Sequence, residues 1–220
     1  YYGMVSLIDK QVGRIVETLA RRGLLENTLI VFTSDHGEML GDHYLFRKCY
    51  PYEGSAHIPM LIRGPDVRPG SVFHDVVCLE DIMPTVLELA GCPIPESVEG
   101  RSLAPLVRGE CTTLGREYLH GEHATCYRYE QANHFLTDGK MKYIWFTCNG
   151  AEQLFHLPSD PGERHNLADD PAWAEELAVW RGRLMERLRN RPEGFVEGGH
   201  LVPGRPHPAL LPWAHGRPRD

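Results

Sequence analysis

Asp35 and His36 are neighbours in the segment 33–43 (TSDHGEMLGDH), and a carboxylate beside an imidazole can ligate a divalent cation. Gly37 follows them and would let the backbone come close to a ligand, because glycine has no side chain. An ordinary capped turn, with its histidine satisfied by hydrogen bonds, would use the same residues. The tripeptide therefore indicates either a metal site or a structural turn.

Lys48 lies 13 residues after Asp35, in a loop that also holds Arg47. A lysine close to a metal can hold an anionic oxygen as a point charge, although most lysines are solvated surface groups. Glu53 and His57 follow and could reach the same crevice. Lys48 and His57 therefore indicate either an anion-binding site or ordinary solvated loop side chains.

Two other motifs resemble reactive sites only in part. Cys49-Tyr50-Pro51 begins like a Cys-x-Pro-x-Arg nucleophile segment, but Glu53 stands where the arginine is required, and no such segment occurs elsewhere in the sequence. The run 120–123 (HGEH) loosely resembles a zinc motif. On a strand, however, His120 and His123 would point to opposite faces. We predict that both motifs are structural.

The polar cluster is expected at the end of a buried strand. Residues 4–22 carry an apolar stripe with helical spacing, and residues 29–33 (LIVFT) form a short, continuous apolar run typical of a strand covered on both faces. Asp35 and His36 follow at the carboxyl end of that strand, which is where open α/β sheets bind ligands. A second strand is predicted over residues 59–63 and a helix over 81–90.

The pattern changes after about residue 110. Four short strands are predicted over residues 117–122, 132–136, 141–146 and 153–157. Asp138-Gly139-Lys140 marks a hairpin, Asp160-Pro161-Gly162-Glu163 marks a turn, and Asp170-Pro171 begins a helix. From Pro192 onward the sequence is rich in proline and shows little periodicity, so an extended tail is expected.

Composition excludes several classes of protein. The formal net charge of −7 argues against a nucleic-acid binder, and no apolar run reaches the ~20 residues of a membrane helix. The six cysteines are too widely spaced for a dense disulfide scaffold or a Cys-x-x-Cys zinc site, which favours thiols and a reducing compartment. Localisation stays open between cytoplasm and periplasm, because any signal peptide would lie upstream.

Taken together, these stretches resemble the sulfatase family, within the alkaline-phosphatase-like superfamily. The matching stretches, in the order that the family has them, are LIDKQVG (7–13), residues 33–43, Lys48, YEG (52–54), DIMPT (81–85), LAG (89–91), GRSL (100–103), KYI (142–144), LFHL (154–157), Asp160-Pro161 and Asn166-Leu167.

The resemblance implies a C-terminal portion of a sulfatase. Residues 1–110 would be the C-terminal part of a doubly wound α/β catalytic domain, and residues 111–191 a small antiparallel sheet with a C-terminal helix. Residues 192–220 would be the proline-rich tail. The family hydrolyses sulfate esters with a formylglycine nucleophile made from cysteine or serine, and that segment would lie upstream of Tyr1.

The resemblance also implies residue roles. Asp35 and His36 fall on two metal ligands, and Lys48 falls on the sulfate-binding lysine. Many members carry asparagine at the position of His36, and the softer imidazole makes Mn²⁺ a rival to the expected Ca²⁺. His57 stands where arginine is common, and the resemblance implies that Lys48 and His57 bind the substrate and that Lys48 is also catalytic.

Three functional hypotheses remain open at this stage. The chain is part of a sulfatase acting on a small-molecule or saccharide sulfate ester, inactive without its N-terminal half. Alternatively, it belongs to a phosphonate monoester or phosphodiester hydrolase of the same superfamily, since His36 also occurs in such enzymes. The third hypothesis is a non-catalytic relic that binds a partner or an anion, against which the joint presence of Asp35, His36 and Lys48 speaks.

Overall fold

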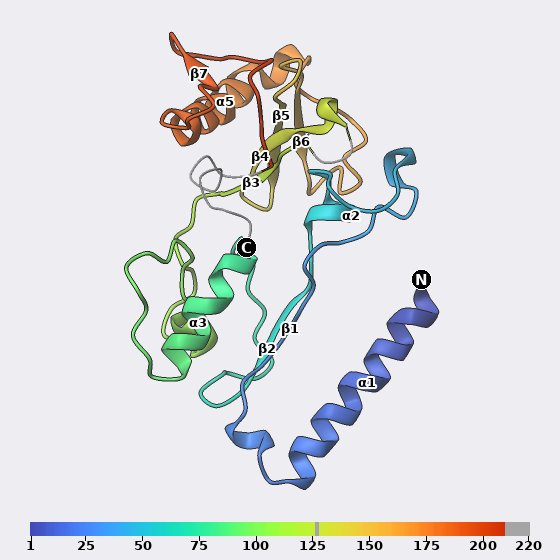
Figure 1. Ribbon diagram of the computed structural model, residues 1–220, viewed down its shortest axis with the longest axis vertical. Coiled ribbons are helices and arrows are strands. Elements are labelled where there is room, and N and C mark those ends of the chain that lie inside the picture. The colour runs from blue at the N-terminus through green and yellow to red at the C-terminus, as the bar shows by residue number, and fades with distance from the viewer. Residues whose placement is uncertain (126–127, 210–220) are drawn as a thin grey trace, which may run out of the picture. The chain divides into compact units, whose positions relative to one another are not determined.

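The computed structural model describes residues 1–125 and 128–209, which form two compact units (Figure 1). The first unit consists of residues 1–34, 59–73 and 78–114. The second unit consists of residues 35–58, 74–77 and the described residues from 115 onward. All four predicted site residues therefore lie in the second unit. The domain boundaries predicted at residues 110 and 191 stay predictions.

The first unit begins with a long helix and a two-stranded sheet. Helix α1 (Tyr2–Arg21) corresponds to the predicted helix, and strand β1 (Ile30–Thr33) pairs antiparallel with β2 (Met60–Arg63). Phe32 in β1 is 40% exposed. None of the four residues of β1 is buried, so the expectation that this strand is covered on both faces is not met by the described residues.

Two short helices complete the first unit. Helix α3 (Ile82–Leu89) confirms the prediction over residues 81–90, and α4 (Ala104–Val107) contributes three buried apolar side chains. Thr85 in α3 is buried, and its hydroxyl accepts a hydrogen bond from the Leu103 backbone N–H at 2.8 Å. This bond ties α3 to the start of α4.

The second unit is built on a four-stranded antiparallel sheet, in the order β3 (Leu119–His123), β4 (Asn133–Thr137), β5 (Met141–Phe146) and β6 (Glu152–His156). Each strand overlaps a predicted one. Between β4 and β5, Gly139 adopts a φ of 84° and the Asp138 carboxylate accepts the Lys140 backbone N–H at 2.8 Å. The predicted hairpin is therefore confirmed.

Helix α5 (Ala174–Leu188) covers one face of this sheet and closes the main apolar core. The Asp170 carboxylate caps the turn that precedes it by accepting the Ala172 N–H at 2.9 Å. Trp180 of α5 is fully buried against Tyr143 and Trp145 of β5. The predicted fold class, α/β with a small antiparallel sheet and a C-terminal helix, is confirmed.

The predicted tail contains local structure as far as it is described. Strands β7 (Val196–Glu197) and β8 (His200–Leu201) form a small hairpin, and Phe195 before it is buried in the main core. Residues 210–220 of the predicted tail lie outside the described residues. The remaining short elements are η1 (Leu25–Asn27), η2 (Asp42–Tyr44), α2 (Glu53–Ala56), η3 (Leu79–Asp81), η4 (Tyr129–Gln131) and η5 (Pro171–Trp173).

Two sequence predictions concern the compartment and the membrane. Cys92, Cys111 and Cys148 are free thiols. Among the described helices, none is both long enough and apolar enough to cross a bilayer.

Candidate active site

His36 is at the centre of the predicted site. Its Nε2 atom lies 3.5 Å from the Asp35 carboxylate and 2.9 Å from the Lys48 ammonium nitrogen. Its Nδ1 atom lies 2.7 Å from the carbonyl oxygen of Gly37. Asp35, His36 and Lys48, which the sequence analysis selected separately, are therefore brought together in one place.

The contact with Gly37 fixes which nitrogen of His36 carries the hydrogen. A carbonyl oxygen can only accept, so Nδ1 donates to it, and Nε2 accepts from the Lys48 ammonium while the Asp35 carboxylate lies beside it. A neutral imidazole held in this way, with a carboxylate beside it, is the arrangement that metal-binding histidines use. The donor set thus fits a divalent cation in type, and Lys48 contacts the same lone pair that such a cation would use.

The turn that carries His36 is held tightly against helix α2. The Gly37 N–H donates to the carbonyl oxygen of Ser55 at 2.8 Å. A Cβ atom placed on Gly37 would lie only 2.1 Å from the carbonyl oxygen of Gly54. Glycine is therefore required at position 37 for a close approach of two backbone segments, in addition to any approach to a ligand.

The loop that carries Lys48 is conformationally strained. Five non-glycine residues in or beside it have left-handed backbone angles, namely Leu40, His43, Tyr44, Arg47 and Cys49. Each such residue costs on the order of 1–3 kcal/mol unless its surroundings enforce it, and strain of this kind concentrates at functional sites. Lys48 stands between two of these residues.

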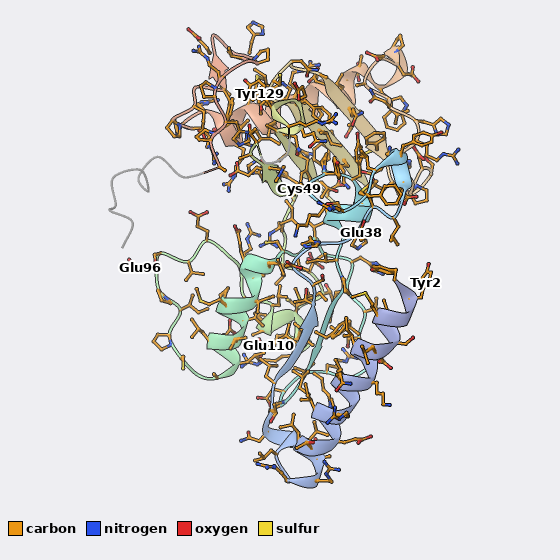
Figure 2. All side chains as sticks on the ribbon, turned by 45° about the vertical axis from the view of Figure 1, so that its right-hand side comes forward. Tyr2, Glu38, Cys49, Glu96, Glu110 and Tyr129 are labelled. Atoms are coloured by element: carbon orange, nitrogen blue, oxygen red, sulfur yellow. The ribbon has the colours of Figure 1, made fainter. Side chains whose placement is uncertain are left out.

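Hydrogen bonds at the base of this loop enforce its shape. The Glu38 carboxylate accepts the backbone N–H groups of Arg47 and Leu40, and the N–H of the fully buried Met39 donates to the Arg47 carbonyl at 2.9 Å. Glu38 and Cys49, near the two ends of the loop, are labelled in Figure 2. These hydrogen bonds therefore fix the backbone position from which Lys48 extends.

His57 is held by an ion network rather than by the loop of Lys48. Its Nδ1 atom lies 2.7 Å from one carboxylate oxygen of Glu53, and the other oxygen of Glu53 accepts from the buried Lys142 ammonium. Lys142 also pairs with Glu163 at 2.9 Å, and a Glu163 oxygen accepts the Glu53 N–H at 2.6 Å. The sheet thereby supports helix α2, from which His57 follows.

This network changes the charge of its members. Burial alone would raise the pKa of Glu53, but hydrogen bonds and positive charge from His57 and Lys142 outweigh it and lower that pKa to about 2. The hydrogen bond to Glu53 raises the pKa of His57 above its ordinary value of 6.5. The His57 imidazole is therefore biased towards its positive form, and its side chain is 75% exposed. An exposed, positively biased group suits contact with an anion.

Sequence reasoning missed two members of this network, Lys142 and Glu163. Lys142 lies within the otherwise apolar run MKYIWF of strand β5, and a lysine at such a position is almost never fully buried unless it is paired. That anomaly was the available signal. Glu163 gave none, because it lies in a turn in which an exposed carboxylate is ordinary.

The sequence of this chain is similar to that of known proteins. A family model described as "Sulfatase" matches residues 1–92. The chain is 43% identical over 210 residues to an arylsulfatase of Clostridium perfringens, covering 94% of this chain and 43% of that protein. The chain thus spans less than half the length of this relative.

Solved structures agree with that match. One protein, solved in complex with its substrate D-glucosamine-2-N,6-O-disulfate, superposes with a TM-score of 0.79 at 28% identity, covering 86% of this chain and 40% of that one. A phosphonate monoester hydrolase from Silicibacter pomeroyi superposes with a TM-score of 0.77 at 34% identity, with the same coverages. The predicted resemblance to the C-terminal portion of sulfatases is confirmed, and this chain belongs to the sulfatase family.

Proposed function

We propose that this chain supplies two metal ligands, Asp35 and His36, and a sulfate-binding lysine, Lys48, to a metal-dependent sulfuric ester hydrolase. The observation that carries the proposal is the convergence of a carboxylate and an ammonium on one imidazole nitrogen, at 3.5 and 2.9 Å. A carboxylate, an imidazole lone pair and a positioned positive charge are the parts needed to hold a cation next to an anionic ester.

Asp35 and His36 would hold the cation, which when bound polarises the sulfate group. We expect Ca²⁺, with Mn²⁺ as the rival because His36 contributes nitrogen where oxygen is usual. Ca²⁺ takes about 6–8 oxygen ligands, so these two residues make only part of its coordination. The remaining ligands would come from the rest of the full-length protein.

Lys48 and His57 would act on the substrate. With His36 holding the cation, the Lys48 ammonium would no longer contact the imidazole and would be available for a sulfate oxygen. There its charge stabilises the negative charge that grows in the transition state. His57 adds a second positive group, since Glu53 raises its pKa.

The nucleophile is not among these residues. The sequence has no Cys-x-Pro-x-Arg segment from which a formylglycine could be made. We therefore propose that the 220 residues alone bind metal weakly and turn over nothing, and that activity belongs to a longer protein that includes such a segment.

The substrate proposed is a sulfate ester of a small molecule or a saccharide. The solved relative that binds a glucosamine disulfate supports the saccharide class. The phosphonate monoester hydrolase at 34% identity supports a second candidate, hydrolysis of phosphonate or phosphate esters on the same residues. Both ester classes present an anionic group with oxygens that Lys48 can bind, so only turnover distinguishes them.

The test compares aryl sulfate and aryl phosphonate turnover by the full-length protein and two matched variants. Lys48→Ala should lower kcat/KM by roughly 10²–10³-fold, the usual cost of removing one preorganised charge-stabilising donor. Lys140→Ala, at an exposed hairpin position, should leave it unchanged. Asp35→Asn should also reduce bound metal. Full activity of Lys48→Ala would contradict the proposal, and preference for the phosphonate would favour the second candidate.

A further inference from the structure

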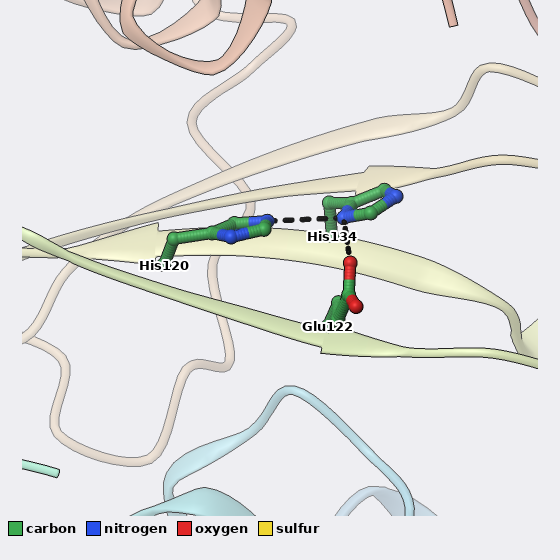
Figure 3. Close-up of side chains that lie close together, drawn as sticks. All are labelled: His120, Glu122 and His134. Atoms are coloured by element: carbon green, nitrogen blue, oxygen red, sulfur yellow. Dashed lines mark hydrogen bonds and ion pairs between the residues drawn. The ribbon is translucent and has the colours of Figure 1, made fainter. Parts of the chain in front are cut away.

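A second group of metal-ligating side chains lies in the sheet of the second unit (Figure 3). His120 and Glu122 are two residues apart on β3 and so share one face of the sheet. Glu122 is paired in register with His134 of β4, which brings the three side chains together. Sequence analysis considered His120 only with His123, on the opposite face, and therefore missed the partner across the strands.

The donor atoms of this His120–Glu122–His134 cluster are close to the spacing of a zinc site. Nε2 of His120 lies 3.0 Å from Nδ1 of His134, and a carboxylate oxygen of Glu122 lies 3.3 Å from the same Nδ1. Tetrahedral zinc with ligands at 2.0–2.1 Å separates neighbouring donors by roughly 3.3 Å. All three donor atoms lie within 4.8 Å of one another.

Hydrogen bonding alone serves these three atoms poorly. A neutral His134 carries one hydrogen, and if Nδ1 holds it that single hydrogen must serve both His120 and Glu122. If Nε2 holds it, a buried N–H is left without a hydrogen-bond partner among the described residues. A divalent cation would engage all three atoms at once.

The surroundings exclude solvent from the two imidazoles. His134 is fully buried and His120 is half-buried. His134 is also stacked on the ring of His207, with centroids 4.8 Å apart, which holds its orientation.

Two positive groups, Arg187 and Arg191, oppose a cation here. The Nε atom of Arg187 lies 3.5 Å from Nδ1 of His120, the ring nitrogen that is not proposed as a ligand. Arg191 instead contacts the carboxylate of the cluster. It is paired with Glu193 at 2.9 Å and also lies 3.1 Å from the Glu122 oxygen that faces His134. The second oxygen of Glu122 lies 3.4 Å from another nitrogen of Arg191. Arg191 can therefore hold Glu122 through that oxygen, as outer-shell partners of ligating carboxylates do.

We propose that His120, Glu122 and His134 form a zinc site, separate from Asp35 and His36, with three protein ligands and one open position. Two imidazoles and a carboxylate are a donor set that Zn²⁺ accepts with a fourth position left for water. Glu122 is exposed, so that position is accessible from solvent.

The test uses the full-length, metal-stripped protein with Asp35→Ala and His36→Ala already introduced, which removes the side-chain donors of the other proposed site. Titration with Zn²⁺, followed by calorimetry, should show one zinc per chain, and Co²⁺ should give the visible absorption of a low-coordinate site. Adding His120→Asn should weaken zinc binding by at least about 100-fold, the upper end of the loss for an outer-shell partner. His123→Asn, from the opposite face of the same strand, should leave it unchanged.

Failure of that parent protein to bind stoichiometric zinc would overturn the inference, as would equal losses in His120→Asn and His123→Asn. Glu122→Gln provides a second variant because its exposed position is tolerant of change, and circular dichroism checks its fold. Parental zinc affinity in a folded Glu122→Gln protein would also overturn the inference. None of these outcomes depends on sulfatase activity, so the proposed function is tested separately.

Discussion

The two compact units are held together in different ways. The second unit closes a core between its sheet and α5, in which Tyr143, Trp145 and Trp180 are buried. In the first unit, α1 buries none of its residues, and the buried apolar side chains are the few around α4. Apolar burial is the main favourable term in folding, so the second unit carries most of the intrinsic stability of the described chain.

This difference bears on where the candidate site is built. Asp35 and His36 follow β1 of the first unit along the chain, yet they group with the second unit, as do Lys48 and His57. The residues proposed for catalysis are thus carried by the better-packed unit. Rigid support is what a site that depends on placed charges needs.

The largest contrast is expected from truncating an apolar side chain in each unit. Trp180→Ala should lower the free energy of unfolding by about 3–5 kcal/mol, because it opens a cavity in the main core. Ile15→Ala on α1, where the isoleucine is 62% exposed, should change it by less than about 0.5 kcal/mol. Urea unfolding of both variants measures the difference, and equal losses would remove the basis of the comparison.

The buried ion network predicts the next largest effect. Lys142→Met should cost roughly 3 kcal/mol, at the low end for breaking a buried ion pair, because Glu53 keeps its bond to His57. Lys140→Met, an exposed lysine of the same hairpin, is the matched control and should be near neutral. Thermal or urea unfolding provides the measurement. A neutral Lys142→Met would show that the network positions helix α2 without stabilising the unit.

The same network predicts a pH dependence. The folded pKa of Glu53 is about 2 and its ordinary value is 4.5, so its contribution to stability is complete above pH 4.5 and is lost as the pH falls towards 2. Lys142→Met removes part of the cause of that shift. The stability difference between wild type and Lys142→Met should therefore shrink as the pH falls from 4.5 towards 2. A constant difference across these pH values would argue against this assignment.

Much of the fold was predictable because it follows local patterns. The apolar run of β5 and the Asp138-Gly139-Lys140 turn defined the hairpin, and the cap at Asp170 defined the start of the last helical region. Which strands pair with each other was harder to predict from the sequence. The antiparallel pairing of β1 with β2 depends on chain reversal between them, which neither strand encodes alone.

The candidate sites show the same distinction between what local sequence predicts and what it does not. Asp35, His36 and Lys48 could be selected from residue type and local position, because all three lie in one short segment after a predicted strand. Lys142 meets Glu53 across 89 residues of sequence, and His134 meets His120 across 14 residues and a strand register. Such contacts depend on tertiary pairing, which residue type and spacing do not specify.

Within the first unit, a buried hydrogen bond should contribute more to the free energy of unfolding than an exposed one. Thr85→Val leaves the Leu103 N–H without its acceptor and should cost about 1–3 kcal/mol. Thr18→Val on α1 removes an exposed hydroxyl that bonds to Arg14 and should cost less than about 0.5 kcal/mol. Unfolding curves for the pair test this. Equal effects would mean that the link between α3 and α4 does not stabilise the unit.

The smallest expected contrast comes from one ion pair in each unit. Arg63 and Glu26 of the first unit pair at 3.0 Å with side chains 47% and 88% exposed, so Arg63→Gln should cost less than about 0.5 kcal/mol. Arg181 of the second unit binds both oxygens of Glu152, at 2.7 and 2.6 Å, and Arg181→Gln should cost about 1 kcal/mol. Raising the salt concentration should reduce both effects, and the first should vanish. If Arg63→Gln lowers the free energy of unfolding as much as Arg181→Gln does, ion pairs contribute equally in the two units. The difference in stability between the units would then come from apolar burial alone.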